Sequence, residues 1–183
     1  ELKNRYSILE NQRATNTMQL EQYKEELKIA HRVQTGLLPD LEHLKEDFQL
    51  VVKSGSADKV GGDYYDYYKI SDTKHAFIIA DVSGKGTSAA FNMAQMKGVF
   101  HSLVRFDLSP DLFFEYANNA LSGWLERKSF ITASYFVLDT EHGKCYFSRA
   151  GHCPTLYHSA ASDNTFYFEN QGLGLGIMRN KSY

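Results

Sequence analysis

The order of strand-like and helix-like segments most restricts the fold that this 183-residue chain can adopt. Strand-like runs come first, two helix-like runs follow in succession, and strand-like runs then return. The predicted strands are 48–54, 64–70, 75–82, 131–139, 144–149, 156–159 and 165–168, and the predicted helices are 87–106 and a second from Pro110 through Trp124. Because helices and strands do not alternate one by one, the order argues against a doubly wound parallel sheet. We expect an α+β domain in which helices cover mostly antiparallel sheets.

Short local signals support this order. Ser109-Pro110-Asp111 is typical of a helix start, with Ser109 as the N-cap residue and Pro110 at the first helical position. The segment 140–143 has the length of a hairpin turn, so the strands on either side of it are expected to pair with each other.

The first 38 residues are polar and are predicted to form a separate helical segment that ends at Gly36 and Pro39. One set of positions recurs at alternating steps of four and three residues, which is a heptad register. Its members are Leu2, Tyr6, Leu9, Arg13, Asn16, Leu20, Tyr23, Leu27, Ala30, Gln34 and Leu37. The register favours a two-stranded coiled coil that forms a homodimer, and the alternative is one amphipathic helix packed on its own domain. We therefore divide the chain into a dimerisation helix, 1–38, and a globular domain, 39–183.

Composition excludes several classes of function. A formal net charge of −2 gives no electrostatic reason to expect nucleic acid as a partner. No apolar run approaches the roughly 20 residues that cross a bilayer, and the N-terminus lacks the apolar region of a signal peptide. The chain has no initiator Met, which is consistent with a piece of a longer protein. Its two cysteines, Cys145 and Cys153, form no CxxC pair, so a reduced, cytoplasmic setting is expected, although the two could still pair.

Two acidic residues in Gly-rich segments are the strongest candidates for a site. Asp63 lies in Gly-Gly-Asp-Tyr-Tyr-Asp, and Asp81 lies in Ala-Asp-Val-Ser-Gly-Lys-Gly at the end of an apolar strand. Carboxylates at strand ends beside glycine turns suit hard cations such as Mg²⁺ or Mn²⁺. Each Asp could instead serve only to cap a turn. Asp66 and Asp58 are nearby candidates for an outer shell and rank below Asp63.

Two nucleotide-binding patterns fail. A P-loop would need Gly at position 79 and Ser or Thr at position 86, where this chain has Ile79 and Gly86. The run Gly172-Leu173-Gly174-Leu175-Gly176 has no βαβ unit after it, so it does not predict a dinucleotide site.

Two further motifs accompany the two Asp motifs. The segment 30–39, which ends in Leu-Leu-Pro, precedes them, and Ala150-Gly151-His152-Cys153-Pro154 follows them, and together the four motifs resemble the SpoIIE-type bacterial serine/threonine phosphatases. These belong to the metal-dependent 2C-like class, and the resemblance implies a sandwich of antiparallel sheets covered by helices. It also implies that Asp81 bridges two divalent cations, Mn²⁺ or Mg²⁺, with the Val82 backbone carbonyl and Asp63 as further ligands. Cys153 stands where Asn is common, and His152 is interpreted as a structural turn residue.

The resemblance implies a reaction and a partner. The reaction would be hydrolysis of phosphoserine or phosphothreonine by metal-activated water, without a catalytic side chain that forms a covalent intermediate. The substrate would be a phosphorylated anti-anti-sigma protein of the STAS type in a partner-switching pathway. Family members carry a later Asp-Gly motif, and no aspartate follows Gly176 here, so the metal site is expected to be incomplete in these residues. The competing hypothesis is therefore a catalytically silent dimeric signalling or scaffold module with the same fold.

Overall fold

The computed structural model describes residues 2–41, 44, 50–54, 60–125, 128–169 and 172–183. In chain order the elements are α1 (Leu2–Leu37), β1 (Tyr64–Lys69), β2 (Lys74–Val82), α2 (Thr87–Leu103), a short 3₁₀ helix η2 (Val104–Phe106), α3 (Pro110–Leu121), β3 (Ile131–Asp139), β4 (Lys144–Ala150), β5 (Thr155–Ser159) and β6 (Asn164–Phe168). The predicted order of strands, two helices and strands is confirmed.

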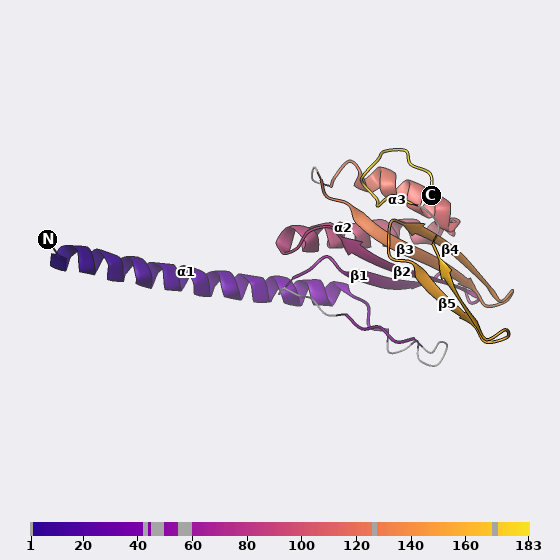
Figure 1. Cartoon of the computed structure of the whole chain (residues 1–183), viewed down its shortest axis with the longest axis horizontal. Coiled ribbons are helices and arrows are strands. Elements are labelled where there is room, and N and C mark those ends of the chain that lie inside the picture. The colour runs from indigo at the N-terminus through magenta and orange to yellow at the C-terminus, as the bar shows by residue number, and fades with distance from the viewer. Residues whose placement is uncertain (1, 42–43, 45–49, 55–59, 126–127, 170–171) are drawn as a thin grey trace.

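The named strands of the described residues pair in antiparallel fashion. One sheet has the order β1-β2-β3-β4, and β5 pairs with β6 in a second, two-stranded sheet. Figure 1 shows α2 and α3 lying along one side of the four-stranded sheet, with the β5–β6 hairpin on its other side. The α+β prediction is therefore confirmed.

The hydrophobic core lies between the four-stranded sheet and the two helices. Strand β2 shows how alternation builds it, because Ile78, Ala80 and Val82 are buried whereas Ile79 is 48% exposed. Aromatic residues fill the centre of this core, where the rings of Phe113 (α3) and Tyr135 (β3) stack with their centroids 4.1 Å apart. The opposite face of the sheet is thus left for other side chains, among them Asp81.

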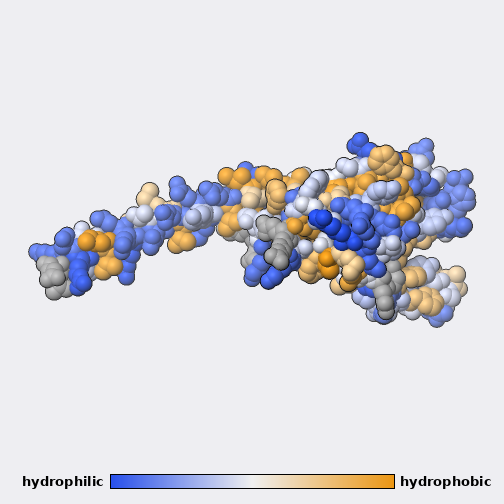
Figure 2. Space-filling view, turned by 90° about the horizontal axis from the view of Figure 1, so that it is seen from above, coloured by the Kyte–Doolittle hydropathy of each residue, from blue (hydrophilic) through white to orange (hydrophobic). Residues whose placement is uncertain are grey.

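Helix α1 extends away from the rest of the molecule (Figure 1). Its heptad positions fall into two groups: Tyr6, Leu20 and Tyr23 are 59–68% exposed, whereas Gln34 and Leu37 near the C-terminal end are partly buried, and Leu37 packs against the core. Figure 2 shows this arm as mainly hydrophilic, with separate hydrophobic patches on its surface. The end of the register thus packs on its own domain, while the earlier part remains uncovered in the single chain.

Two predicted boundaries are wrong, and one is confirmed. Residues 50–54 form no strand, and Val51 is 91% exposed; residues 48–49 lie outside the described residues. The helix predicted over 87–106 is confirmed as α2 to Leu103 and η2 to Phe106, closed by Asp107 at a positive φ of 49°. Helix α3 ends at Leu121, and Trp124 lies in the following turn, 63% exposed.

Two smaller predictions can also be compared with the structure. Ser109 precedes α3 as expected and Pro110 occupies its first turn, but the Ser109 side chain does not cap the helix. Cys145 and Cys153 are both free and exposed, so they do not pair. Among the helices in the described part of the chain, none is both long and apolar enough to span a membrane.

Candidate metal centre

The two candidate ligands meet at one end of the four-stranded sheet. Strands β1 and β2 pair with Tyr64 opposite Ala80, so Asp63 directly precedes β1 beside Asp81, the second-last residue of β2. Both aspartates are exposed. Because Ala80 and Val82 are buried under the helices, strand alternation directs Asp81 to the opposite face of the sheet. The sheet register therefore brings together two carboxylates that are 18 positions apart in sequence.

A glycine contact places Asp63 against the end of β2. A Cβ on Gly62 would lie 2.6 Å from the carbonyl oxygen of Val82, a separation that no side chain tolerates. The Val82 amide donates a hydrogen bond of 3.3 Å to the Gly62 carbonyl. Gly62 is therefore needed for close backbone approach, and the Val82 carbonyl oxygen lies beside the segment that carries Asp63.

Ser83 anchors the loop after Asp81 through two hydrogen bonds with the backbone of Phe130. Its amide donates to the Phe130 carbonyl at 2.9 Å, and its hydroxyl accepts from the Phe130 amide at 2.8 Å. Gly84 and Gly86 then adopt positive φ angles of 94° and 76°, which residues with a Cβ avoid. The chain can in this way turn sharply from the Asp81 strand into α2, as the Gly-Lys-Gly sequence predicts.

The electrostatics of the pair favour a bound cation. Burial and the neighbouring Asp63 carboxylate raise the pKa of Asp81 above its ordinary value, and His152 partly offsets them. A carboxylate whose pKa is raised by a like charge is one that a cation stabilises. The charge of Asp81 is therefore unfavourable in the protein alone.

His152 borders the pair from the β4–β5 connection. Its Nδ1 lies 3.0 Å from the Thr132 hydroxyl, and Thr132 is the residue of β3 that pairs with Asp81. Burial lowers the pKa of His152, as does Arg149, whereas Asp81 and Asp63 raise it. The imidazole thus lies close enough for both carboxylates to act on its pKa, and its hydrogen bond with Thr132 fixes the orientation of its ring.

The donor set fits part of a hard-cation site. Two carboxylates and the Val82 carbonyl supply oxygen only, which is the chemistry that Mg²⁺ and Mn²⁺ prefer, but such ions take about six ligands. Within the described ranges, no group of three or more His, Cys, Asp or Glu side chains is arranged to hold a metal ion. Asp66 lies on the helix-covered face of β1 and is bonded there, so the structure separates it from this pair. Asp58 lies outside the described residues.

One contact near the site was not foreseen from the sequence. The side-chain amide of Gln34 near the end of α1 forms two hydrogen bonds with the backbone of Gly61: its Nε2 donates to the carbonyl, and its Oε1 accepts from the amide at 3.1 Å. The sequence places Gln34 in the heptad register and in the segment 30–39 that resembles the family, but neither pattern predicts this contact. Since Gly61 is two residues before Asp63, α1 is tied directly to the segment that carries a candidate ligand.

Comparison with solved structures identifies the class of fold. The SiaA-PP2C domain of Pseudomonas aeruginosa superposes with a TM-score of 0.74 at 17% identity, covering 90% of this chain and 67% of that one. RsbX, solved in complex with magnesium, gives a TM-score of 0.56 at 20% identity, covering 67% of this chain and 58% of its own. At these identities the likeness defines the fold, which is that of the PP2C, or 2C-like, phosphatase domains.

Sequence comparison identifies the family. Residues 71–183 match the family described as Stage II sporulation protein E (SpoIIE), and the chain belongs to that family. The phosphoserine phosphatase RsbU of Bacillus subtilis (strain 168) is 32% identical over 164 residues, which are 89% of this chain and 48% of RsbU. The chain therefore spans about half the length of this curated relative. The predicted resemblance to SpoIIE-type phosphatases is confirmed.

Proposed function

We propose that the protein to which this chain belongs hydrolyses phosphoserine or phosphothreonine on a regulatory protein. The observation that carries the proposal is the pair Asp63 and Asp81, side by side and solvent-accessible at one sheet end, with the pKa of Asp81 raised by partial burial and by its Asp63 neighbour. Membership of the SpoIIE family and the name of RsbU as a phosphoserine phosphatase support the same reaction.

In this proposal the Asp81 carboxylate would be the ligand shared by the divalent cations, and the Asp63 carboxylate and the Val82 backbone carbonyl would be further ligands. When bound, such cations, Mn²⁺ or Mg²⁺, activate water and neutralise the charge of the phosphoryl group. Water attacks phosphorus, the bond to the serine oxygen breaks, and a proton passes to that oxygen, so that inorganic phosphate and a free hydroxyl are released. Three protein donors do not fill the shell of a hard cation, so water or further oxygen ligands would complete it.

The chain's own residues organise the surroundings of this centre. Ser83 and the two glycines after it hold the Asp81 loop, and Gly62 allows the Asp63 segment to approach. His152, bonded to Thr132, forms a fixed wall beside the carboxylates, and we keep its interpretation as a structural residue.

The substrate class is the finer part of the proposal. A phosphorylated anti-anti-sigma protein of the STAS type, acting in a partner-switching pathway, is the partner that the family resemblance favours. The first test is a phosphatase assay on the complete protein with Mn²⁺ and such a phosphoprotein. Release of phosphate that disappears in Asp81→Asn supports the proposal, and no release under any metal would favour the silent scaffold module instead.

We also propose that residues 1–38 form a homodimeric coil and that residues 39–183 form the phosphatase domain. The uncovered heptad positions of α1 support the coil, because a lone helix gains nothing by exposing them. The Gln34 contact with Gly61 supports a route from coil to metal centre, since a change in coil packing would act on the segment before Asp63.

The coil can be tested through its polar members. Replacing Arg13 and Asn16 together by Leu is expected to strengthen dimerisation, since both lie on the heptad seam and are exposed in the single chain. Light scattering gives the dimer fraction, and the phosphatase assay shows whether output becomes fixed high or low. A protein that stays monomeric at all practical concentrations, with unchanged activity, would contradict the proposal.

A further inference from the structure

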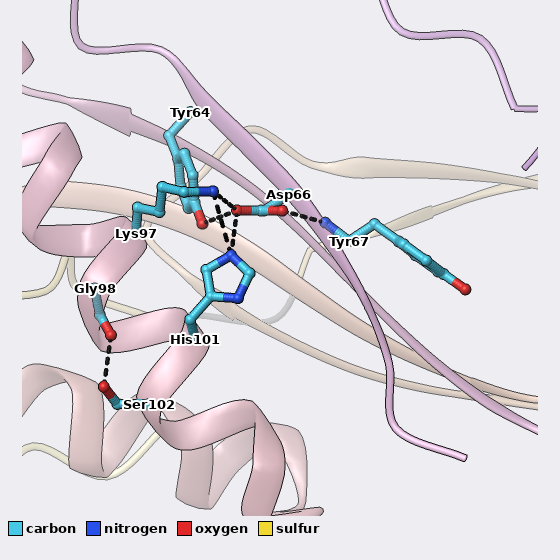
Figure 3. A network of polar contacts seen from close by, with 7 residues as sticks. All are labelled: Tyr64, Asp66, Tyr67, Lys97, Gly98, His101 and Ser102. Carbon is cyan, nitrogen blue, oxygen red and sulfur yellow. Dashed lines mark hydrogen bonds and ion pairs between the residues drawn. The ribbon is translucent and has the colours of Figure 1, made fainter. Parts of the chain in front are cut away.

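A buried ion network ties β1 to α2 on the face of the sheet opposite Asp81 (Figure 3). Its centre is Asp66, which is only 3% exposed. One carboxylate oxygen, Oδ2, accepts from the Tyr64 hydroxyl at 2.7 Å and from Lys97 Nζ at 2.8 Å, and His101 Nε2 lies 2.9 Å from it. The other oxygen, Oδ1, accepts from the Tyr67 amide at 2.8 Å.

This network keeps a charge inside the protein. Burial acts to raise the pKa of the Asp66 carboxyl, but hydrogen bonds from Lys97, Tyr64, Tyr67 and His101 outweigh it and hold the pKa below its ordinary value. Buried ion pairs add little net stability compared with apolar residues of the same shape, because desolvation offsets the attraction. Buried ion pairs do constrain geometry, because both partners must meet at hydrogen-bond distance.

Helix α2 needs such a directional contact. The part of its buried face nearer the Asp81 loop carries Ala89, Met93 and Met96, which are small or flexible side chains that permit several positions of a helix on a sheet, whereas the rigid Val99 and Phe100 pack farther along the helix. Lys97 and His101 are four residues apart and so lie on one face of α2, where both reach the same carboxylate oxygen. A helix held at two points by one buried oxygen has far less freedom to slide or rotate.

The two elements joined here lead to the two candidate ligands. Asp63 precedes Asp66 by three residues on the β1 side, and α2 begins at Thr87, six residues after Asp81. The network therefore connects β1, which follows Asp63, to α2, which follows the Asp81 loop. Any shift of α2 on β1 would be passed to that loop through the turn at Gly84 and Gly86.

We propose that Asp66, Lys97 and His101 are positioning residues of the metal centre, which fix the seat of α2 and thereby the placement of the Asp81 loop relative to Asp63. The inference rests on the proposed metal centre but assigns these residues no contact with metal or substrate. It predicts that the network determines how tightly the cations bind.

The test is a calorimetric titration of the full-length protein with Mn²⁺. Lys97→Met keeps the apolar stem and removes the charge, and it should raise the Kd for Mn²⁺ about tenfold, in the range known for residues that orient metal ligands. Lys97→Arg should restore the Kd to within about twofold, because it keeps the charge and the donors. At saturating Mn²⁺ the turnover number of Lys97→Met should stay near that of the wild type.

The chain offers a matched control. Lys74, at the start of β2, forms an ion pair with Asp107 after η2, at the opposite end of the strand from Asp81. Lys74→Met also removes a lysine–aspartate ion pair between two elements, though a more exposed one, and should leave the Kd for Mn²⁺ unchanged. If Lys97→Met does not fold, the double variant Asp66→Asn/Lys97→Met removes both charges together and should show the same weaker binding.

The outcomes separate this inference from the proposed function. Unchanged Mn²⁺ affinity in folded Lys97→Met, or an equal loss in Lys74→Met, would overturn the positioning role. If neither the single nor the double variant folds, the network serves the fold as a whole and the inference is wrong. Wild-type protein that binds Mn²⁺ without releasing phosphate would refute the phosphatase, while the affinities would still decide the inference. Wild-type protein that binds no Mn²⁺ would overturn both.

Discussion

Asp66 and Asp81 lie on adjacent strands of one sheet, yet their surroundings are opposite. Asp66 faces α2, is nearly inaccessible, and is surrounded by a lysine, a histidine, a tyrosine hydroxyl and a backbone amide. Asp81 is on the other face, is exposed, and its strongest charged neighbour is another carboxylate, Asp63. The pKa of the first carboxyl is lowered and that of the second is raised.

This difference separates a structural acid from a candidate ligand. The charge of Asp66 is balanced by groups that the fold itself supplies, so it has no need of anything from solution. The charges of Asp81 and Asp63 oppose each other, so the pair is stabilised only when a cation arrives from outside. Exposure alone does not mark Asp81 as a candidate ligand, because many exposed aspartates bind nothing. The neighbouring carboxylate of Asp63 is what distinguishes Asp81 from Asp66.

The largest expected effect is on catalysis. Asp81→Asn in the complete protein should remove nearly all phosphatase activity while leaving the fold intact, because the amide cannot bridge two cations. Asp63→Asn should weaken the dependence on Mn²⁺ and lower activity less severely. Phosphate release across a Mn²⁺ series, with circular dichroism as the control for folding, checks both. Near-normal turnover by Asp81→Asn at saturating Mn²⁺ would contradict the ligand assignment.

The next effect is on stability, at the other carboxylate. Asp66→Asn should lower the free energy of unfolding by about 2 kcal/mol, below the full cost of breaking a buried pair because Lys97 is 24% exposed. The loss arises because the Lys97 ammonium remains beside an amide that carries no charge. Urea unfolding of this chain gives the value. An unchanged midpoint would mean that the network adds nothing to the stability of the folded state.

Low pH should remove the difference in unfolding free energy between the wild type and Asp66→Asn. Since the folded-state pKa of Asp66 is lowered, the stability that its ionisation contributes is present above its unfolded pKa, about 4, and is lost as the pH falls through the lower folded value. The gap between wild type and Asp66→Asn should therefore be constant from neutral pH to about pH 5 and shrink below about pH 4. Urea midpoints over this range test it, and a gap that persisted undiminished at pH 2 would assign the effect to packing.

The smallest effect should have the opposite sign. Without metal, Asp81→Asn should stabilise the fold slightly, because it relieves repulsion from Asp63. The gain should be about 0.5 kcal/mol or less, since solvent screens an exposed group. Thermal melts without Mn²⁺ measure this gain.

The residues described here bring together only part of a metal site, so this chain alone should also bind Mn²⁺ weakly. Thermal melts with and without Mn²⁺ measure this binding. Tight binding of two ions by this chain would mean that other residues complete the site.

Prediction from the sequence was strongest where a local pattern sets local structure. The β2 strand, the hairpin between β3 and β4 and the glycine turn after Asp81 were each predicted within a residue or two, because alternation and positive φ act over a few neighbours. The segment 50–54 was mispredicted because an apolar run becomes a strand only where a partner strand lies beside it. Trp124 was mispredicted because helix periodicity does not show where a helix stops.

Ordered motifs and strand patterns lie in adjacent residues, so the amino-acid sequence is enough to identify an α+β member of the SpoIIE family with Asp63 and Asp81 as its leading ligand candidates. That Asp66, three residues from Asp63, has a different role becomes visible only in the folded chain. Its partners Lys97 and His101 lie more than thirty positions away. The same holds for Gln34, whose contact with Gly61 spans 27 positions. The physical reason is that a carboxylate's role depends on which charges share its space, and those neighbours are set by the packing of α2 on β1.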